Sequence, residues 1–499
     1  MRLHIAIGLL LALAPLAGDG ESPPRERLVD LDVVAVDAHG QPVSGLTLED
    51  FRVTDAGRPQ KIAFFRHFDA RLRQPPALAP NEVSNRSRSN IPHATVILLD
   101  MLNERFETRA FAADQLAHNL QSLETADYLY LYLLTLNGRL YAVRGLPGAA
   151  DPPSGPQAAP WTRQAKSLMD AAMRRFMQVR PVDIDVAVRV QLTYTALEEL
   201  SVELSKVPGR KNLVWITDGV PISLGPRRSD TGDFVDFTQP LRQLSEHLGL
   251  SGVAVYPVRQ VMMGSPDAMG AGRGDGIGSE ETLDEVAGLT GGRPDAGKDI
   301  GQAIRQAMND VRTGYQIGYY PPVQHWDGKF HKLRVSCSRK GVRIQAKSGY
   351  YAHPEPPGAE ARRAIDAVAS TPFDAAEIGL RAKLSPDPHS AGTAHLAVRI
   401  DANDVVIARE EHQYTAHLRL AVIGYQSDGR KEASAIIPLD LHYSDQQRSQ
   451  ALQQGVPFAN DLKIEENLKA FRCVVFDSGS NAVGSVTIPV PAAAPSPKP

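Results

Sequence analysis

The chain has 499 residues, which at roughly 100–200 residues per domain corresponds to about three domains. Its 42% hydrophobic and 22% charged residues are typical of a folded globular protein. The 54 Lys and Arg residues nearly balance the 57 Asp and Glu residues, so there is no overall basic field to attract nucleic acid or anionic lipid. The two cysteines, Cys337 and Cys473, are far apart, which excludes zinc ribbons, iron–sulfur sites and a disulfide-dense scaffold.

Residues 1–20 have the pattern of a secretory signal. A basic start precedes an apolar run from Ile5 to Ala17, and small residues follow up to Gly20. The run is too short to span a bilayer comfortably. We therefore expect an exported protein, periplasmic or extracellular, that contacts the membrane only if this segment stays uncleaved as an anchor.

A small β-module is expected next, over residues 28–69. Short alternating segments are separated there by turns at residues 38–40 and 55–57. Residues 70–92 lack periodicity and are rich in Pro, Asn and Ser, which predicts a linker. The glycosylation sequon that begins at Asn85 is interpreted as part of this linker.

An alternation of strands and helices begins at residue 93. The continuous apolar segment that ends at Asp100 has the length of a strand buried on both faces. Strands alternating with helices predict a mostly parallel sheet covered on both faces, whose ligands bind at the carboxyl ends of the strands where the strand order switches. Asp100 and Asp218 both fall at such strand ends. The expected strands are 93–100, 128–135, 139–143, 213–217 and 253–258, and the expected helices are 112–123, 164–179, 185–206, 234–248, one opening at 279 and one over 300–311.

Four sequence motifs, which follow one another along residues 28–352, resemble those of a known protein family. They are GQPVSGLTLEDFRVTDAGRPQKIAFF, then LSKVPGRKNLVWITDGVP, then LTGGRPDAGKDIGQAI with TGYQIGYYPP, and last DGKFHKLRVSCSRKGVRIQAKSGYYA. Together they resemble a family of exported bacterial proteins related to the von Willebrand factor type A (VWFA) domain. The resemblance implies a central α/β, Rossmann-like von Willebrand type A domain, which in this class binds protein through a bound divalent cation.

The resemblance also implies a set of metal ligands. The family site takes an Asp-x-Ser-x-Ser strand end, a Thr from a second loop and an Asp from a third. Asp100 and Asp218 match the two aspartates. Thr193 is the nearest candidate for the threonine, with Thr195 as the alternative in a shifted register, although both lie in a helical pattern.

The chain departs from this pattern at two positions, because Leu102 and Glu104 stand where the serines belong. Leucine cannot ligate a cation. In one interpretation Asp100, Glu104 and Asp218, helped by Asn103 and water, hold Mg²⁺ or Ca²⁺ in a modified site. In the other, the site is degenerate and its aspartates cap neighbouring helices.

The end of the chain is β-rich again. A hairpin with its turn at residues 338–341 follows the α/β segment, and we hypothesise that it packs with the strands of residues 28–68, so that the α/β domain is an insertion in a β-module. Five or more short strands with turns at 427–429 and 477–479 then predict an Ig-like sandwich. The expected divisions are 1–20 signal, 28–69 β-module, 70–92 linker, 93–322 von Willebrand type A domain, 323–352 hairpin extension, 353–370 linker and helix, 371–491 sandwich and 492–499 disordered tail.

The favoured function is that of an exported, non-catalytic, adhesion-type protein that binds a protein partner through its strand-end loops. The sequence places no histidine, cysteine or activated serine in a catalytic motif, which favours binding over catalysis. One alternative is an exported metal-assisted hydrolase with Asp100, Glu104 and Asp218 as ligands or base. Another is a structural envelope component with a dead site.

Overall fold

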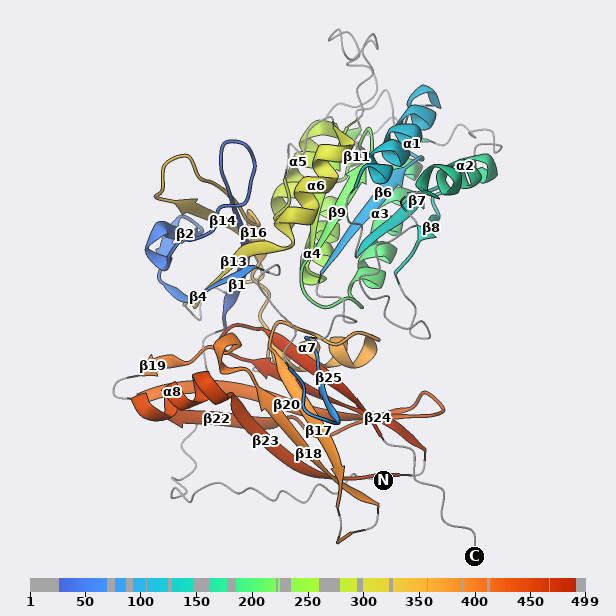
Figure 1. Cartoon of the computed structure of the whole chain (residues 1–499). Helices are drawn as coiled ribbons and strands as arrows, with labels where there is room; N and C mark the ends of the chain where they lie inside the picture. Colours follow the sequence, from blue (N-terminus) through green and yellow to red (C-terminus); the bar gives the residue numbers. More distant parts are fainter. Residues whose placement is uncertain are drawn as a thin grey trace, which may run out of the picture. The chain divides into compact units, whose positions relative to one another are not determined.

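The computed structural model describes residues 27–69, 77–86, 93–104, 106–123, 128–146, 162, 164–176, 185–220, 223–224, 235–259, 279–293, 299–322, 326–356, 358–387, 389–390, 392–410, 413–465 and 467–490. The predicted signal and C-terminal tail lie outside these residues. The chain divides into two compact units (Figure 1). The α/β unit comprises residues 29–73 and 93–354, and the C-terminal unit comprises residues 1–28, 74–92 and 355–499.

The α/β unit contains a five-stranded sheet of order β12-β9-β6-β7-β8. Its strands are β6 (Ala94–Asp100), β7 (Leu129–Leu134), β8 (Leu140–Arg144), β9 (Lys211–Ile216) and β12 (Val253–Val258). All neighbours are parallel except the edge strand β8, which forms an antiparallel hairpin with β7. The chain moves from β6 outward to β7 and β8, and then returns to β9 on the other side of β6. The strand order therefore switches between β6 and β9.

Helices cover both faces of this sheet. They are α1 (Phe106–Gln121), α2 (Ala165–Phe176), α3 (Val186–Leu204), α4 (Thr238–Leu250), α5 (Ser279–Thr290) and α6 (Ile300–Asp310). Ile97 and Leu99 of β6 share a buried core with α1, α2 and α6. Because successive strand residues point to opposite faces, Tyr132 of β7 points to the other face, where its hydroxyl donates to Glu203 of α3 at 2.9 Å. Helix α4 packs beside α3 on that second face, and α5 packs beside α4 and against β12.

Two further four-stranded sheets complete the α/β unit, with orders β15-β1-β13-β4 and β16-β14-β2-β3. Their strands are β1 (Val29–Val36), β2 (Phe51–Asp55), β3 (Arg58–Gln60), β4 (Ile62–Asp69), β13 (Thr313–Tyr319), β14 (Phe330–Cys337), β15 (Arg343–Gln345) and β16 (Gly349–Tyr351). β14 pairs with β2, and β15 pairs with β1, so the strands that flank the α/β segment do join in common sheets as hypothesised. A two-stranded ribbon of β10 (Ser223–Leu224) and β11 (Val235–Asp236) is separate from them.

The strand β13 corrects one expected boundary. Its residues fall within the α/β domain predicted over residues 93–322, but β13 pairs with β1 and β4 instead. All seven of its residues are buried, and Tyr315, Ile317 and Tyr319 belong to the core of these sheets. Among the described residues, β12 is thus the last strand of the α/β sheet, and it is followed by α5 and α6.

The C-terminal unit contains two sheets packed face to face. One has the order β23-β18-β17-β5, and in the other β20 and β24 are central, with β19, β21, β22 and β25 around them. Their strands are β5 (Glu82–Ser84), β17 (Leu380–Pro386), β18 (Thr393–Ile400), β19 (Ala408–Glu410), β20 (Gln413–Gln426), β21 (Lys431–Ala433), β22 (Ile437–Tyr443), β23 (Val456–Lys463), β24 (Leu468–Asp477) and β25 (Val483–Pro489). Inward residues of both sheets, such as Leu396 and Leu418, form one buried core. Helix α7 (Ala359–Ser370) covers the outer face of β20 and β24, and α8 (Asp445–Gln454) precedes β23.

The predicted linker 70–92 contains a strand, which the sequence analysis missed. β5 pairs antiparallel with β17 at the edge of the first sheet. The Asn85 amide donates to the carbonyls of Ala375 and Ile378 at 2.6 and 2.7 Å and accepts from the Leu380 amide at 2.8 Å. This side chain is 1% exposed, so the sequon residue is a structural part of the C-terminal unit.

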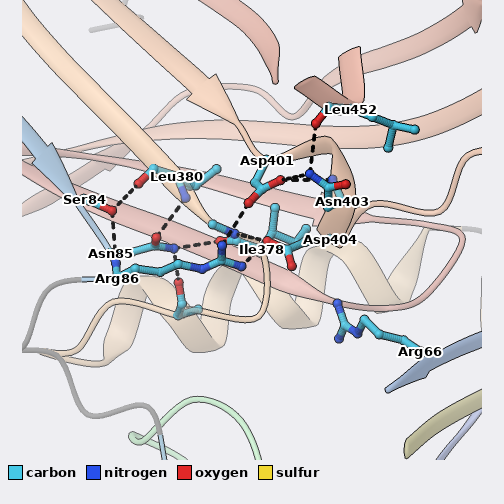
Figure 2. A network of polar contacts seen from close by, with 12 residues as sticks. Arg66, Ser84, Asn85, Arg86, Ile378, Leu380, Asp401, Asn403, Asp404 and Leu452 are labelled. Atoms are coloured by element: carbon cyan, nitrogen blue, oxygen red, sulfur yellow. Dashed lines mark hydrogen bonds and ion pairs between the residues drawn. The ribbon is translucent and has the colours of Figure 1, made fainter. Parts of the chain in front are cut away.

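Arg86 extends the same attachment through charge (Figure 2). Its guanidinium pairs with Asp401 at 2.9 Å and with the buried Asp404. Asp404 also accepts the amide of Gly379 at 2.8 Å. A segment nearly 300 residues away in sequence from β17 is therefore held by a partly buried polar network, which we call the Arg86 cluster (Asn85, Arg86, Asp401 and Asp404).

The two cysteines are both free thiols in separate units, half-buried Cys337 on β14 and buried Cys473 on β24. Burial raises the pKa of Cys473 to about 12, which leaves it an inert apolar side chain. Within the part of the chain that the structure describes, no helix combines the length and apolar character needed to cross a membrane.

Candidate functional site

The candidate site is centred on Asp100, at the carboxyl end of β6. The register pairs Leu99 with Ile216, so Asp100 lies beside Thr217, the residue that follows β9. These are the two strands between which the strand order switches, the position where open α/β sheets bind ligands. Asp100 itself is completely buried.

The carboxylate of Asp100 accepts four hydrogen bonds, and every donor is neutral. One oxygen, Oδ1, accepts the backbone amide of Asn103 at 3.0 Å. The other, Oδ2, accepts the Asn103 side-chain amide at 2.8 Å, the Trp215 indole N–H at 3.1 Å and the Thr217 hydroxyl at 2.8 Å. A carboxylate has about four lone-pair sites, so these donors use nearly its whole accepting capacity.

Asn103 joins Asp100 to the helix α3. Its Nδ2 also lies 2.8 Å from the hydroxyl oxygen of Thr193. That hydroxyl donates its own proton to the Arg189 carbonyl at 2.8 Å, so its oxygen is oriented to accept from Asn103. Thr193 is fully buried inside α3 and not on a loop, whereas the alternative Thr195 is exposed on the same helix. We call Asp100, Asn103, Thr193, Trp215 and Thr217 the Asp100 cluster.

Glu104 and Asp218 lie at the edge of this cluster. The Glu104 amide donates to the Asp100 carbonyl at 3.2 Å, its carbonyl accepts from Arg109 Nε at 3.0 Å, and its side chain is buried. Asp218 is half-exposed just beyond Thr217, whose hydroxyl oxygen accepts the Gly219 amide at 2.9 Å. The structure thus brings Asp100, Asn103 and Thr193 into direct contact, attaches Glu104 through its backbone, and leaves Asp218 nearer the surface.

Burial raises the pKa of Asp100 above its ordinary value of 3.8. The hydrogen bonds from Asn103, Thr217 and Trp215 favour the charged form and oppose this shift without cancelling it. The direction follows from the environment, because neutral donors replace the water that ionised Asp100 would have, and no cation is among them.

The donor set does not fit a divalent cation. A Mg²⁺ or Ca²⁺ ion needs about six to eight oxygen ligands, and here the position between Asp100 and Thr193 is filled by an N–H₂ group. Leu102, at a position where the family has a ligating serine, is an apolar buried side chain. Among the residues that the structure describes, no group of three or more His, Cys, Asp or Glu side chains is placed to hold a metal ion.

Trp215 and Thr217 are the members of the cluster that the sequence analysis missed. They are two residues apart at the end of β9 and so point to the same side of the sheet. A tryptophan in a fully buried strand needs a partner for its indole N–H. That requirement, next to a predicted strand-end aspartate, is a signal that would have linked β9 to Asp100.

The burial of Asp100 limits the chemistry that this cluster can perform, because a substrate cannot reach the carboxylate. A general base or nucleophile must come within hydrogen-bond reach of a substrate, and Asp100 has no exposed surface. Its contacts instead hold the loop after β6 against the loop after β9 and against α3. The arrangement can keep the half-exposed segment at Asp218 and Gly219 in one conformation.

No family model matches this sequence, and no curated protein matches it. Among solved structures, one similar chain is a von Willebrand factor type A protein from Catenulispora acidiphila, with 8% identity and a TM-score of 0.28 over 86% of this chain and 73% of that one. Another contains three N-terminal domains of the type V pili tip protein Mfa5 from Porphyromonas gingivalis, with 8% identity and a TM-score of 0.21 over 94% and 78% of the two chains. Both likenesses are coarse.

Proposed function

We propose that this is an exported, non-catalytic protein that binds a protein partner through the strand-end loops of its α/β sheet. We further propose that this sheet with its helices is a Rossmann-like von Willebrand type A domain, and that the C-terminal sheets are an Ig-like module. When the five strands of the α/β sheet are numbered in chain order, their order across the sheet from β8 to β12 is 3-2-1-4-5. This is the order of doubly wound sheets, and it supports the Rossmann-like assignment.

The observation that carries the functional proposal is the complete burial of Asp100 at the position where the strand order switches. A hydrolase would need a carboxylate there that can reach water and substrate. A carboxylate covered by four neutral donors instead fixes the loops around it. Fixed loops favour binding, because less conformational entropy is lost when a partner docks on them.

The proposed contact surface is the segment that the Asp100 cluster supports. Asp218 and Gly219 are half-exposed, and the Thr217 hydroxyl below them both donates to Asp100 and accepts from the Gly219 amide. Because the chain has no overall basic or acidic excess, we expect specificity to come from the shape and local chemistry of this surface.

Site-specific photo-crosslinking tests this surface. A photoreactive residue in place of Asp218 should capture a discrete protein from a cell-envelope extract. The same residue in place of Val202, which is 65% exposed on α3, is the matched control and should capture nothing above background. Equal capture at both positions would contradict binding at the strand ends, and capture at neither would favour the structural envelope component.

Export is a separate part of the proposal, and it rests on the pattern of residues 1–20. We expect protein recovered from the envelope or medium to begin between residues 18 and 21. N-terminal sequencing measures this directly. A mature chain that keeps Met1 and fractionates with the cytoplasm would contradict export.

A further inference from the structure

We infer that the side-chain amide of Asn103 takes the place of a divalent cation in the Asp100 cluster, so that this surface forms without Mg²⁺ or Ca²⁺. The inference does not depend on the proposed partner, since it concerns only how the cluster is held together. Its basis is the position of one group, Nδ2 of Asn103, between Asp100 and Thr193.

That group bridges, at hydrogen-bond distances, two oxygens that could otherwise be joined by a shared ion. Nδ2 lies 2.8 Å from Asp100 Oδ2 and 2.8 Å from Thr193 Oγ1, and so joins an acidic oxygen to a hydroxyl oxygen across two elements of the unit. A cation would bridge the same two oxygens by coordination. The amide does so with its two N–H bonds, and it carries no net charge.

The neighbouring contacts fix the orientation of the amide. The backbone N–H of Asn103 donates to the other oxygen of Asp100, so the loop is already folded onto the carboxylate. The Thr193 hydroxyl is committed as a donor to Arg189, and therefore offers its lone pair to the amide. Rotating the side chain by 180° would put its carbonyl oxygen against the carboxylate, which electrostatics disfavours.

The rest of the cluster makes cation binding unfavourable. Trp215 and Thr217 occupy the Asp100 oxygen that faces Asn103, so an incoming ion would have to displace two donors as well as the amide. The Trp215 indole N–H can only donate a hydrogen bond, so it could not ligate the ion and would be left buried without an acceptor. The Asn103 amide thus replaces the cation itself as the link between Asp100 and Thr193, at a site where Leu102 and Glu104 supply no serine oxygens.

The substitution Asn103→Asp tests this inference. It replaces the amide by a second carboxylate next to Asp100, a pair that is destabilised unless a cation lies between its members. We expect the variant to melt at a lower temperature than the wild type in EDTA. Mg²⁺, Ca²⁺ or Mn²⁺ at about 100 times its Kd should then raise its Tm by about 5–10 °C. Asn467→Asp, which adds the same charge at an exposed position, is the matched control and should not respond.

The wild-type protein provides the second measurement. We expect its Tm to be the same in EDTA and in each cation, and titration calorimetry with Mn²⁺ to show no saturable binding. Saturable binding to the wild type that is lost in Asp100→Ala would overturn the inference. The inference would also be overturned if no divalent cation changed the Tm of the Asn103→Asp protein or restored its folding.

Discussion

Two polar clusters, one fully buried and one partly buried, hold together parts of this chain that are distant in sequence, and they do so by opposite means. The Asp100 cluster surrounds a carboxylate with neutral donors from β6, α3 and β9. The Arg86 cluster pairs the carboxylates of Asp401 and Asp404 with a guanidinium. One joins elements of a single sheet and its helix, and the other joins a segment before the α/β domain to strands that follow it.

The difference appears in the protonation of the carboxylates. Burial raises the pKa of Asp100, and its neutral donors do not outweigh that effect. Burial also acts to raise the pKa of Asp401, but the Asn403 hydrogen bonds and the Arg86 charge outweigh it, and the net pKa is lowered. In the Asp100 cluster, which contains no cationic side chain, burial therefore destabilises the ionised carboxylate. In the Arg86 cluster the guanidinium stabilises the ionised carboxylates.

The largest expected effect is at Arg86. Arg86→Met leaves the buried carboxylate of Asp404 without its cation, and removal of one partner from a buried pair costs about 3–5 kcal/mol. We expect the free energy of unfolding of the C-terminal unit to fall by this amount, and amides of β17 and β24 to exchange faster with solvent. Arg430→Met removes an exposed pair with Asp428 and is the control. Equal exchange in the two variants would show that β5 is not held by Arg86.

Asp100→Ala tests the other cluster. The substitution leaves the buried indole N–H of Trp215 and the donors of Asn103 and Thr217 without their acceptor, which should lower the free energy of unfolding by about 2–4 kcal/mol. Tryptophan fluorescence reports this unit alone, because the three tryptophans lie in residues 93–354. Asp170→Ala, an exposed position on α2, is the control. A fluorescence transition that moves equally in both variants would contradict the geometry described.

Thr193→Val sharpens the comparison by removing a single link of the Asp100 cluster. The side chain keeps its shape but loses the hydroxyl that accepts from Asn103, so we expect a loss of about 1 kcal/mol in the free energy of unfolding. Thr195→Val, exposed on the same helix, should cost less. Chemical denaturation followed by tryptophan fluorescence measures both, and a larger loss at Thr195 would place the link elsewhere.

The smallest expected effect is a difference in pH dependence. Between 3.8 and its raised pKa, folded Asp100 holds more protons than the unfolded chain, so its contribution to stability falls as pH rises. Asp401 has a lowered pKa, so its contribution is present above 3.8 and is lost as pH falls through the folded value. The stability differences between wild type and Asp100→Asn, and between wild type and Asp401→Asn, should therefore change with pH in opposite directions. Slopes of the same sign would contradict the comparison.

The two clusters also differ in how far the sequence predicts them. The apolar runs that end at Asp100 and before Asp218 predict two buried strands with an aspartate at the carboxyl end of each, because burial on both faces leaves a local pattern. The role of Asn103 was not predicted, since it depends on where α3 places Thr193. No local sequence pattern predicts the Arg86 cluster. The partners of Arg86 are about 300 residues away, and the three-residue strand β5 is too short to show a periodicity.

The strand β13 shows the same limit within one unit. Residues 313–319 were placed in the α/β domain without a strand being predicted for them, and the structure contains a fully buried strand there. Its sequence does not say which sheet it joins, because a strand buried on both faces fits the centre of either. The pairing with β1 and β4 is decided by long-range packing of Tyr315 and Tyr319, which a local pattern cannot report.

The most direct test of the central claim, that the Asp100 cluster is closed by an amide and not by a cation, is a crystal structure of the wild-type protein grown with excess Mn²⁺. An anomalous difference map identifies the metal without assumptions about its ligands. We expect no manganese peak within coordination distance of Asp100, and the Asn103 amide between Asp100 and Thr193. A manganese peak bridging these two side chains, with Asn103 displaced, would contradict the account.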